Sequence, residues 1–311
     1  MSDLDTAARP FAPTAPFDDS SADVILRSSD AVNFHVYRVI LSVASPFFKQ
    51  MFMLPQPSSE PDIPIIDVSE SALVLNSALR FWYPGAEPAT EETVDVLRET
   101  LEVLILKYDM QFLVPAAKKC LRGRLDRDAI AVFAIACRLR WKDMAVDAAQ
   151  ATLKLPIRAF ESPQLDQLDC IGAKDYHSLL YYHAECGKAA TAATSSLEWY
   201  HFIRVGSPGG DCNTSPDICP YADGGEWKFA QSETRQVMKW FADHLAELTT
   251  IIGRTPGAKL DSPELLLKVH QGSQICPDCR KSGLARVVKF SAVLEAHIQK
   301  KLDSIKLNLD F

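Results

Sequence analysis

The amino-acid sequence predicts an α+β fold for the N-terminal part of the chain, in which helices cover a small sheet, followed by a mostly α-helical C-terminal region. Two short apolar segments, Val24–Leu26 and Val32–Val36, flank the polar turn Ser28–Asp30 and indicate a strand–turn–strand unit. From Tyr37 to Met53 apolar residues recur at the three-to-four-residue spacing of a helix face. With 311 residues, the chain is long enough for two domains.

Helix caps and breakers divide the rest of the N-terminal part. Ser45-Pro46 splits the first helical stretch in two, because serine suits a helix N-cap and proline suits the first helical position. Ile63–Val68 is a candidate third strand, after which Ser69 can cap a helix that Pro84-Gly85 ends. Two further helices complete this part, one with a stripe of Val94, Leu97, Leu101, Leu104 and Tyr108 and one over Val114–Leu125.

The organisation of the whole chain follows from composition. Residues 1–20 are rich in proline, alanine, serine and aspartate, so we expect a disordered tail there. A domain over residues 21–125 comes next, and residues 126–311 form the helical region, which opens with the alanine-rich pair Ala129–Leu139 and Lys142–Leu153. Within this region we expect a Gly/Pro-rich loop at about residues 206–225.

Charge and hydropathy exclude several classes of function. The formal net charge is −7 and the basic residues are scattered along the chain, so we expect no nucleic-acid partner. No stretch approaches the ~18 consecutive apolar residues of a membrane span, and the acidic, proline-containing N-terminus is unlike a secretory signal. We therefore expect a cytoplasmic or nuclear protein whose eight cysteines stay reduced, as core thiols or metal ligands.

An ordered series of motifs spans about a hundred residues. Asp23–Leu26 is followed by Phe34–Phe48, then by Met51-Phe52 and later by the aromatic helix end Leu79–Gly85. This series resembles the BTB/POZ domain, with one departure, because Tyr37 stands where the family usually has histidine. Together with the later helical segments, the chain is similar to a group of BTB-domain proteins found in mushroom-forming (basidiomycete) fungi.

The resemblance implies an interaction role and a surface that carries it. In the family, apolar residues of the first helix pair two copies into a dimer, and an acidic and a basic residue form a charged patch beside them. The matching positions here are Asp23, Arg38, Val39, Ile40, Val43 and Ala44. The alternative is that the four apolar residues are all used inside the monomer.

One motif could hold a metal ion. The two-residue gap in Cys276-Pro-Asp-Cys279 lets both thiolates face one tetrahedral zinc ion. Cys212 and Cys219, in the Gly/Pro-rich loop, would complete a structural site, whereas His183 and Cys186 are an alternative pair at helical spacing. The other interpretation is that the motif simply starts a helix. No catalytic zinc signature, nucleophile elbow or phosphate loop is present, so we expect no enzymatic activity.

Three functional hypotheses follow. The first is a scaffold or adaptor that binds protein partners and self-associates through the BTB-like domain. The second is a substrate adaptor that binds a cullin in a cullin-RING ubiquitin ligase, although Gln56 replaces the glutamate that such adaptors often carry after the second helix. The third is a zinc-dependent enzyme or regulator built around Cys276 and Cys279.

Overall fold

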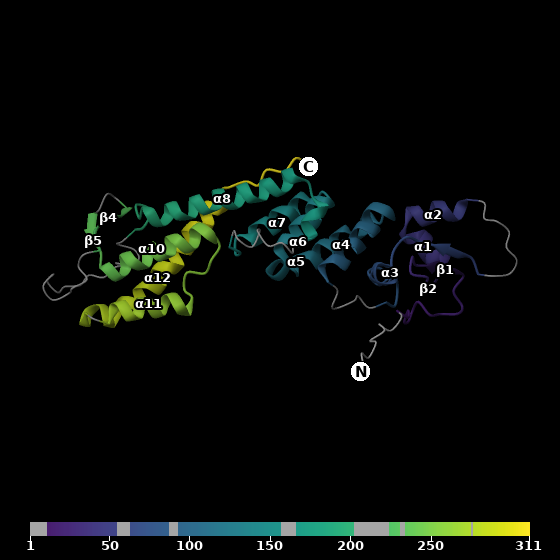
Figure 1. Ribbon diagram of the computed structural model, residues 1–311, viewed down its shortest axis with the longest axis horizontal. Coiled ribbons are helices and arrows are strands. Elements are labelled where there is room, and N and C mark those ends of the chain that lie inside the picture. Colours follow the sequence, from purple (N-terminus) through teal and green to yellow (C-terminus); the bar gives the residue numbers. More distant parts are fainter. Residues whose placement is uncertain are drawn as a thin grey trace, which may run out of the picture. The chain divides into compact units, whose positions relative to one another are not determined.

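The chain folds into two units. In the computed structural model, the described residues are 11–54, 63–86, 93–156, 166–201, 224–230, 234–274 and 276–311. Unit 1 covers Met1–Met144 and unit 2 covers Ala145–Phe311. Figure 1 labels the helices and strands of both units.

Unit 1 contains the predicted small sheet. Its strands are β1 (Val24–Arg27), β2 (Asn33–Val36) and β3 (Ile65–Asp67), in the order β2-β1-β3. β1 pairs antiparallel with β2 and parallel with β3. Alternate side chains of β1 and β2 point into the core, which contains Val24, Leu26, Phe34 and Val36.

Six α-helices accompany this sheet in the described part of unit 1. They are α1 (Arg38–Ala44), α2 (Pro46–Met53), α3 (Ala72–Arg80), α4 (Val94–Glu102), α5 (Val114–Arg122) and α6 (Leu125–Arg138). A π-helix (Val103–Lys107) extends α4, and a 3-10 turn (Gln111–Leu113) precedes α5. The α+β prediction, with helices around a three-stranded sheet, is confirmed.

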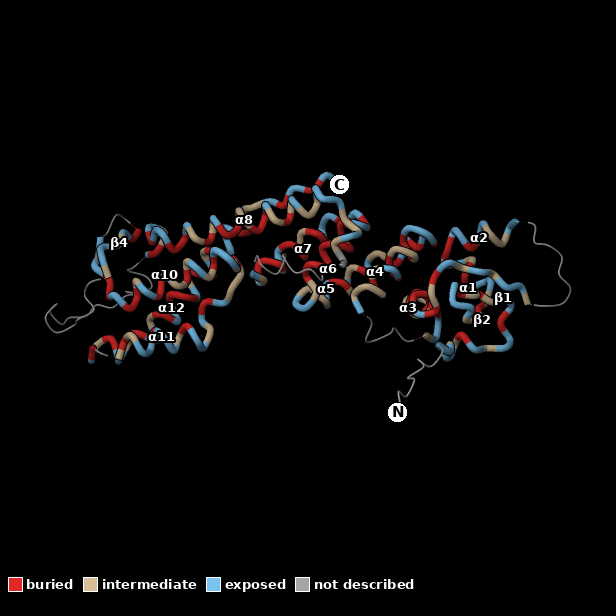
Figure 2. Tube along the Cα trace, viewed as in Figure 1, coloured by how far each residue is buried: buried red, intermediate tan, exposed pale blue. Residues whose placement is uncertain are grey.

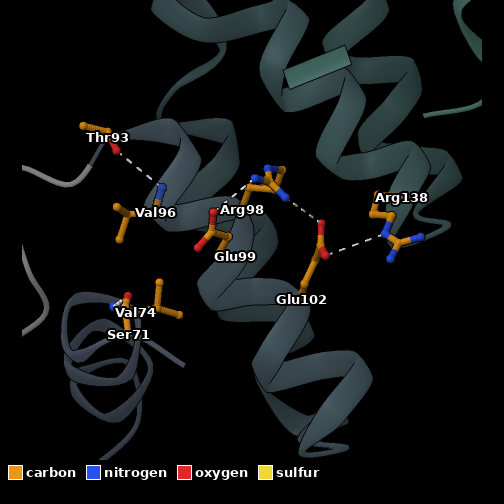
Figure 3. A network of polar contacts seen from close by, with 8 residues as sticks. All are labelled: Ser71, Val74, Thr93, Val96, Arg98, Glu99, Glu102 and Arg138. Carbon is orange, nitrogen blue, oxygen red and sulfur yellow. Dashed lines mark hydrogen bonds and ion pairs between the residues drawn. The ribbon is translucent and has the colours of Figure 1, made fainter. Parts of the chain in front are cut away.

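Caps and ion pairs fix the ends of these helices (Figure 3). The cap of α3 is Ser71 rather than the predicted Ser69, because the Ser71 hydroxyl accepts a hydrogen bond from the Val74 amide. Glu102 on α4 pairs with Arg98 one turn earlier and with Arg138, at 3.3 and 3.7 Å. The second pair links α4 to the C-terminal end of α6 and ties α6 to unit 1.

The second half of the predicted N-terminal tail is packed. Phe17 is fully buried, and its carbonyl accepts a hydrogen bond from the His35 amide on β2. Residues 11–20 are therefore part of the packed unit, while residues 1–10 lie outside the described residues. Burial of the single aromatic residue Phe17 explains why this segment is packed although its composition is typical of disorder. One such residue has little effect on the average composition of twenty residues. The two units divide after Met144. The predicted domain boundary near residue 125 stays a prediction.

Unit 2 is mostly helical, as predicted. After α7 (Lys142–Thr152), which spans the boundary, it contains a 3-10 turn (Asp166–Cys170), α8 (Ala173–Ser195), α10 (Lys239–Arg254), α11 (Pro263–Ser273) and α12 (Pro277–Leu302). α8 packs against α10 and α12, and α11 packs against the same two helices. Phe241 of α10 and Phe290 of α12 meet edge-on in the core, with ring centroids 5.1 Å apart.

Two further observations complete the description of the fold. A short antiparallel hairpin, β4 (Glu226–Lys228) and β5 (Thr234–Gln236), was not predicted. In the described part of the chain, no helix is long and apolar enough to cross a membrane.

Candidate interaction surface

Helix α1 presents an apolar face to solvent. Of its seven residues only Leu41 is buried, whereas Val39 and Val43 are 64% and 84% exposed. Figure 2 colours the chain by burial and labels α1. Single exposed apolar residues are common on protein surfaces. A β-branched pair one turn apart on one short helix forms a continuous patch, and such patches mark binding surfaces.

This face forms one wall of an apolar groove in unit 1. The groove has a volume of about 490 Å³ and is lined by Val39, Ile40, Val43, Ala44, Trp82, Pro84 and Phe112. Trp82 and Pro84 follow the end of α3, where Gly85 takes a φ of 79° and turns the chain away. Phe112 comes from the 3-10 turn before α5 and is itself 60% exposed. The groove therefore joins three segments that are far apart in the sequence.

A buried serine sets the direction of α1. Ser45 separates α1 from α2, and its hydroxyl accepts a hydrogen bond from the Phe48 amide at 3.3 Å, which caps α2. The same hydroxyl donates to the carbonyl of Tyr108 at 2.7 Å. The helix break is thus anchored to the segment after the π-helix, so α1 is held at a fixed angle to α2.

Tyr108 links this break to Glu70, which lies between β3 and α3. Its ring packs against Phe47 and Phe48 of α2, and its hydroxyl donates to the Glu70 carboxylate at 3.0 Å. Glu70 is buried and also pairs with Lys107, so its negative charge is compensated. Burial raises the pKa of Tyr108 far above its ordinary value, and the neighbouring Glu70 adds to this effect. The phenol therefore stays protonated as a donor.

Asp23 and Arg38, predicted as a charged patch, both act on the backbone near α1. The Arg38 amide donates to the Asp23 carboxylate at 2.7 Å, so Asp23 satisfies one of the first amides of α1. The Arg38 guanidinium donates to the Phe52 carbonyl and lies 4.7 Å from the Phe52 ring centroid. Both residues are exposed, and they fix α1 to β1 and α2.

Tyr37 holds the N-terminal segment. Its hydroxyl donates to the Asp19 carboxylate at 2.6 Å, and this bond is the main cause that lowers the pKa of Asp19 to about 2. The Tyr37 amide donates to the Tyr83 hydroxyl at 3.0 Å. A phenol at the position where the family usually has histidine therefore makes defined hydrogen bonds of its own.

The predicted metal ligands are only partly described. Cys276 and Cys279 are buried at the N-terminal end of α12, whereas Cys212 and Cys219 lie outside the described residues. Among the residues that the structure describes, no three or more potential ligands gather at one point. The zinc site therefore stays a prediction.

The alternative pair is buried in unit 2. A ring nitrogen of His183 lies 3.1 Å from the Leu155 carbonyl, and burial lowers the pKa of this histidine. Burial also raises the pKa of Cys186 to about 11, so its thiol stays protonated at neutral pH. These two residues fit a structural role in the core better than metal binding.

A comparison with known families decides the nature of unit 1. The family model for the BTB/POZ domain matches residues 16–123, from the segment that Tyr37 holds to the end of α5. Residues 16–123 are a BTB/POZ domain. BTB/POZ domains are protein–protein interaction modules, and the family is not an enzymatic one. No curated protein matches the chain.

The BTB/POZ domain places four of the six predicted interaction residues together. Val39, Ile40, Val43 and Ala44 all line the groove. Sequence reasoning missed the other three lining residues, Trp82, Pro84 and Phe112. The aromatic helix end at Trp82 contributes to the family resemblance and marks a helix boundary, but nothing in it indicates a contact with α1. No local signal connects Phe112 to α1 either.

Proposed function

We propose that the protein is an adaptor or scaffold whose BTB/POZ domain binds a polypeptide at the α1 groove. The observation that carries this proposal is the groove itself, because it is apolar, open and flanked by the exposed side chains of Val39 and Val43. The supports of α1 at Asp23, Ser45 and Tyr108 favour a rigid surface, and a rigid surface loses less entropy on binding. A hydrolytic or redox role has no comparable support in the described residues.

The partner that fits this groove is a second copy of the chain. A two-fold interface uses the same patch on both subunits, so that patch must offer both a projection and a recess. α1 offers both, since Val39 and Val43 project from it and the groove lies beside it. Crossing the α1 helices of two copies would place each valine pair in the groove of the other. About 800 Å² per subunit is enough for a specific complex of this kind.

Sedimentation of the full-length protein over a range of concentrations tests this proposal. The double variant Val39→Asp/Val43→Asp is expected to be monomeric where the wild type is dimeric, because four carboxylates would be brought together in an apolar contact. Leu73→Asp is the matched control, since Leu73 is an exposed apolar residue near the start of α3 and does not line the groove. A wild type that stays monomeric at all concentrations, or a double variant that dimerises normally, would contradict self-association.

The cullin-adaptor hypothesis rests on the family alone. Pro55 and Gln56, which carry the departure from the family signature, lie outside the described residues. Direct binding of a purified cullin N-terminal domain to the full-length protein would support this role. Absence of binding would contradict the cullin-adaptor hypothesis and leave the general adaptor role untouched. The zinc-dependent enzyme or regulator hypothesis depends on Cys276 and Cys279 and is tested by metal content below.

A further inference from the structure

The outward face of α12 in unit 2 has an unusual composition. Helix α12 has 26 residues, and one face of it packs against α8 and α11. The opposite face is exposed and carries the row Ala285, Val288, Ala292 and Ala296 at intervals of three and four residues. Leu284, 36% exposed, lies beside Val288, 40% exposed. Small apolar side chains replace the polar ones that usually cover the solvent side of a helix.

The same face carries cations without carboxylate partners. Lys281, Lys289 and Lys300 are exposed, and none of them forms an ion pair with another described residue. This pattern contrasts with three other lysines of unit 2, which pair with Glu185, Asp243 and Glu247: Lys188, Lys239 and Lys268.

The acidic residues of α12 do not balance these cations. Glu295 lies at the edge of the face and already accepts a hydrogen bond from the Leu260 amide at 2.6 Å. The other acid, Asp278, is in the first turn of the helix, where the dipole favours it. The exposed face is therefore positive in a protein whose formal net charge is −7.

We propose that this face of α12 binds an acidic amphipathic helix of a partner protein. The apolar stripe of the partner would lie on the row from Ala285 to Ala296, and its aspartates and glutamates would pair with Lys281, Lys289 and Lys300. Small side chains on α12 let a second helix axis approach to about 8–10 Å. The distance from residue 281 to residue 300 corresponds to about 28 Å of helix, which is enough for a partner of about five turns.

Charge and side-chain type separate this partner from other candidates. Two α12 faces from two copies of the chain would bring lysines together, and like charges across an interface oppose association. The row contains no aromatic side chain that could stack on nucleic-acid bases. Its alanines are also too small for the deep apolar face with which surface helices enter a bilayer.

This inference deepens the adaptor role, because an adaptor needs a second binding surface besides the α1 groove. It concerns a different unit from the groove. Loss of self-association in the Val39→Asp/Val43→Asp protein and loss of helix binding at α12 can therefore be observed separately.

Fluorescence anisotropy with full-length protein tests the inference. The probe is a labelled peptide of about five helical turns, with leucines on one stripe and glutamates beside it; a scrambled peptide of the same composition shows whether amphipathic spacing matters. We expect the amphipathic peptide to bind and its affinity to fall when salt is raised, since the ion pairs are exposed. The triple variant Lys281→Glu/Lys289→Glu/Lys300→Glu should weaken binding about tenfold or more.

Two more variants guard against indirect effects. Val288→Glu puts a charge in the centre of the row and should abolish binding without unfolding the protein, because the residue is partly exposed. Lys259→Glu makes the same charge change at an exposed lysine outside α12 and should leave binding unchanged. Circular dichroism of each variant checks that the helices are intact.

Three results would overturn the inference. The first is equal binding of the amphipathic and scrambled peptides, or no binding of either. The second is peptide binding that survives both the triple variant and Val288→Glu. The third is that vesicles containing phosphatidylserine, or a single-stranded oligonucleotide, bind the wild type in a Lys281/Lys289/Lys300-dependent manner while the peptide does not.

Discussion

Lowering the pH from 7 to 5 is expected to destabilise unit 2. Protonation of His244 should account for most of the lost free energy of unfolding. His244 lies on α10 and is only 4% exposed. Neither of its ring nitrogens has a hydrogen-bond partner among the described residues. Burial lowers the pKa of His244 to about 4 from an ordinary value of 6.5, and the nearby carboxylate of Glu247, which pairs with Lys268, offsets only part of this effect.

The sign and size follow from proton linkage. Between pH 4 and pH 6.5 the unfolded chain binds a proton at His244 and the folded chain does not. The free energy of unfolding therefore has its full value above about pH 6.5 and falls as the pH drops towards 4. With these two pKa values, the loss is about 2 kcal/mol between pH 7 and pH 5 and about 3 kcal/mol in full.

Urea unfolding at pH 7, 6 and 5, for wild type and His244→Phe, measures this loss. Hydrogen exchange of α10 peptides assigns the relevant transition to unit 2. His183 and His297 also have lowered pKa values through burial, so both proteins will lose some stability on acidification. Only the difference between them reports His244: the free energy of unfolding of the wild type, relative to that of His244→Phe, should fall by about 2 kcal/mol from pH 7 to pH 5. Parallel pH profiles would refute the assignment of a buried, neutral imidazole.

Three further predictions concern the supports of α1 and the cysteines. Ser45→Ala should lower the free energy of unfolding by about 2 kcal/mol, because it removes a helix cap and leaves the Tyr108 carbonyl without its donor. Thermal melts measure this loss, with Ser42→Ala as the control. Equal losses of stability in the two variants would contradict the role of Ser45. Tyr37→Phe should cost about 1 kcal/mol and speed hydrogen exchange in residues 11–22, since the bond to Asp19 is lost; unchanged exchange there would argue against this anchor. If Cys276 and Cys279 bind zinc together with Cys212 and Cys219, purified protein should contain stoichiometric zinc that Cys276→Ser removes and Cys186→Ser keeps. Metal-free protein with native helix content would end the zinc hypothesis.

Local chemistry made much of unit 1 predictable. Ser45-Pro46 marks the break between α1 and α2, and the short apolar run Val24–Leu26 before a polar turn marks β1, because caps and turn signals act over a few residues. The groove was only partly predictable, because part of its lining comes from residues that are distant in the sequence. Trp82 and Phe112 reach α1 through tertiary packing, and nothing in their immediate neighbours encodes that approach.

Unit 2 was less predictable. The hairpin strands β4 and β5 have three residues each and are rich in polar residues, so they lack the periodic pattern of a strand. The basic residues of α12 looked scattered when read along the chain. Only the helix brings Lys281, Lys289 and Lys300 to one face, because at ~3.6 residues per turn their side chains fall within about 100° of one another around the axis.

The question left open by the sequence was whether the apolar residues of α1 serve the monomer or a partner. A helix of seven residues is too short to be stable alone, so contacts must hold it. Leu41 is the one residue of α1 that is buried inside the monomer. The position of the helix depends on hydrogen bonds of Asp23 and Ser45 at its two ends. Val39 and Val43 therefore add little to the stability of the unit, and replacing them with polar residues would make the monomer more soluble. Apolar side chains that the monomer does not bury, on a helix fixed at both ends, are better explained by a partner that covers them.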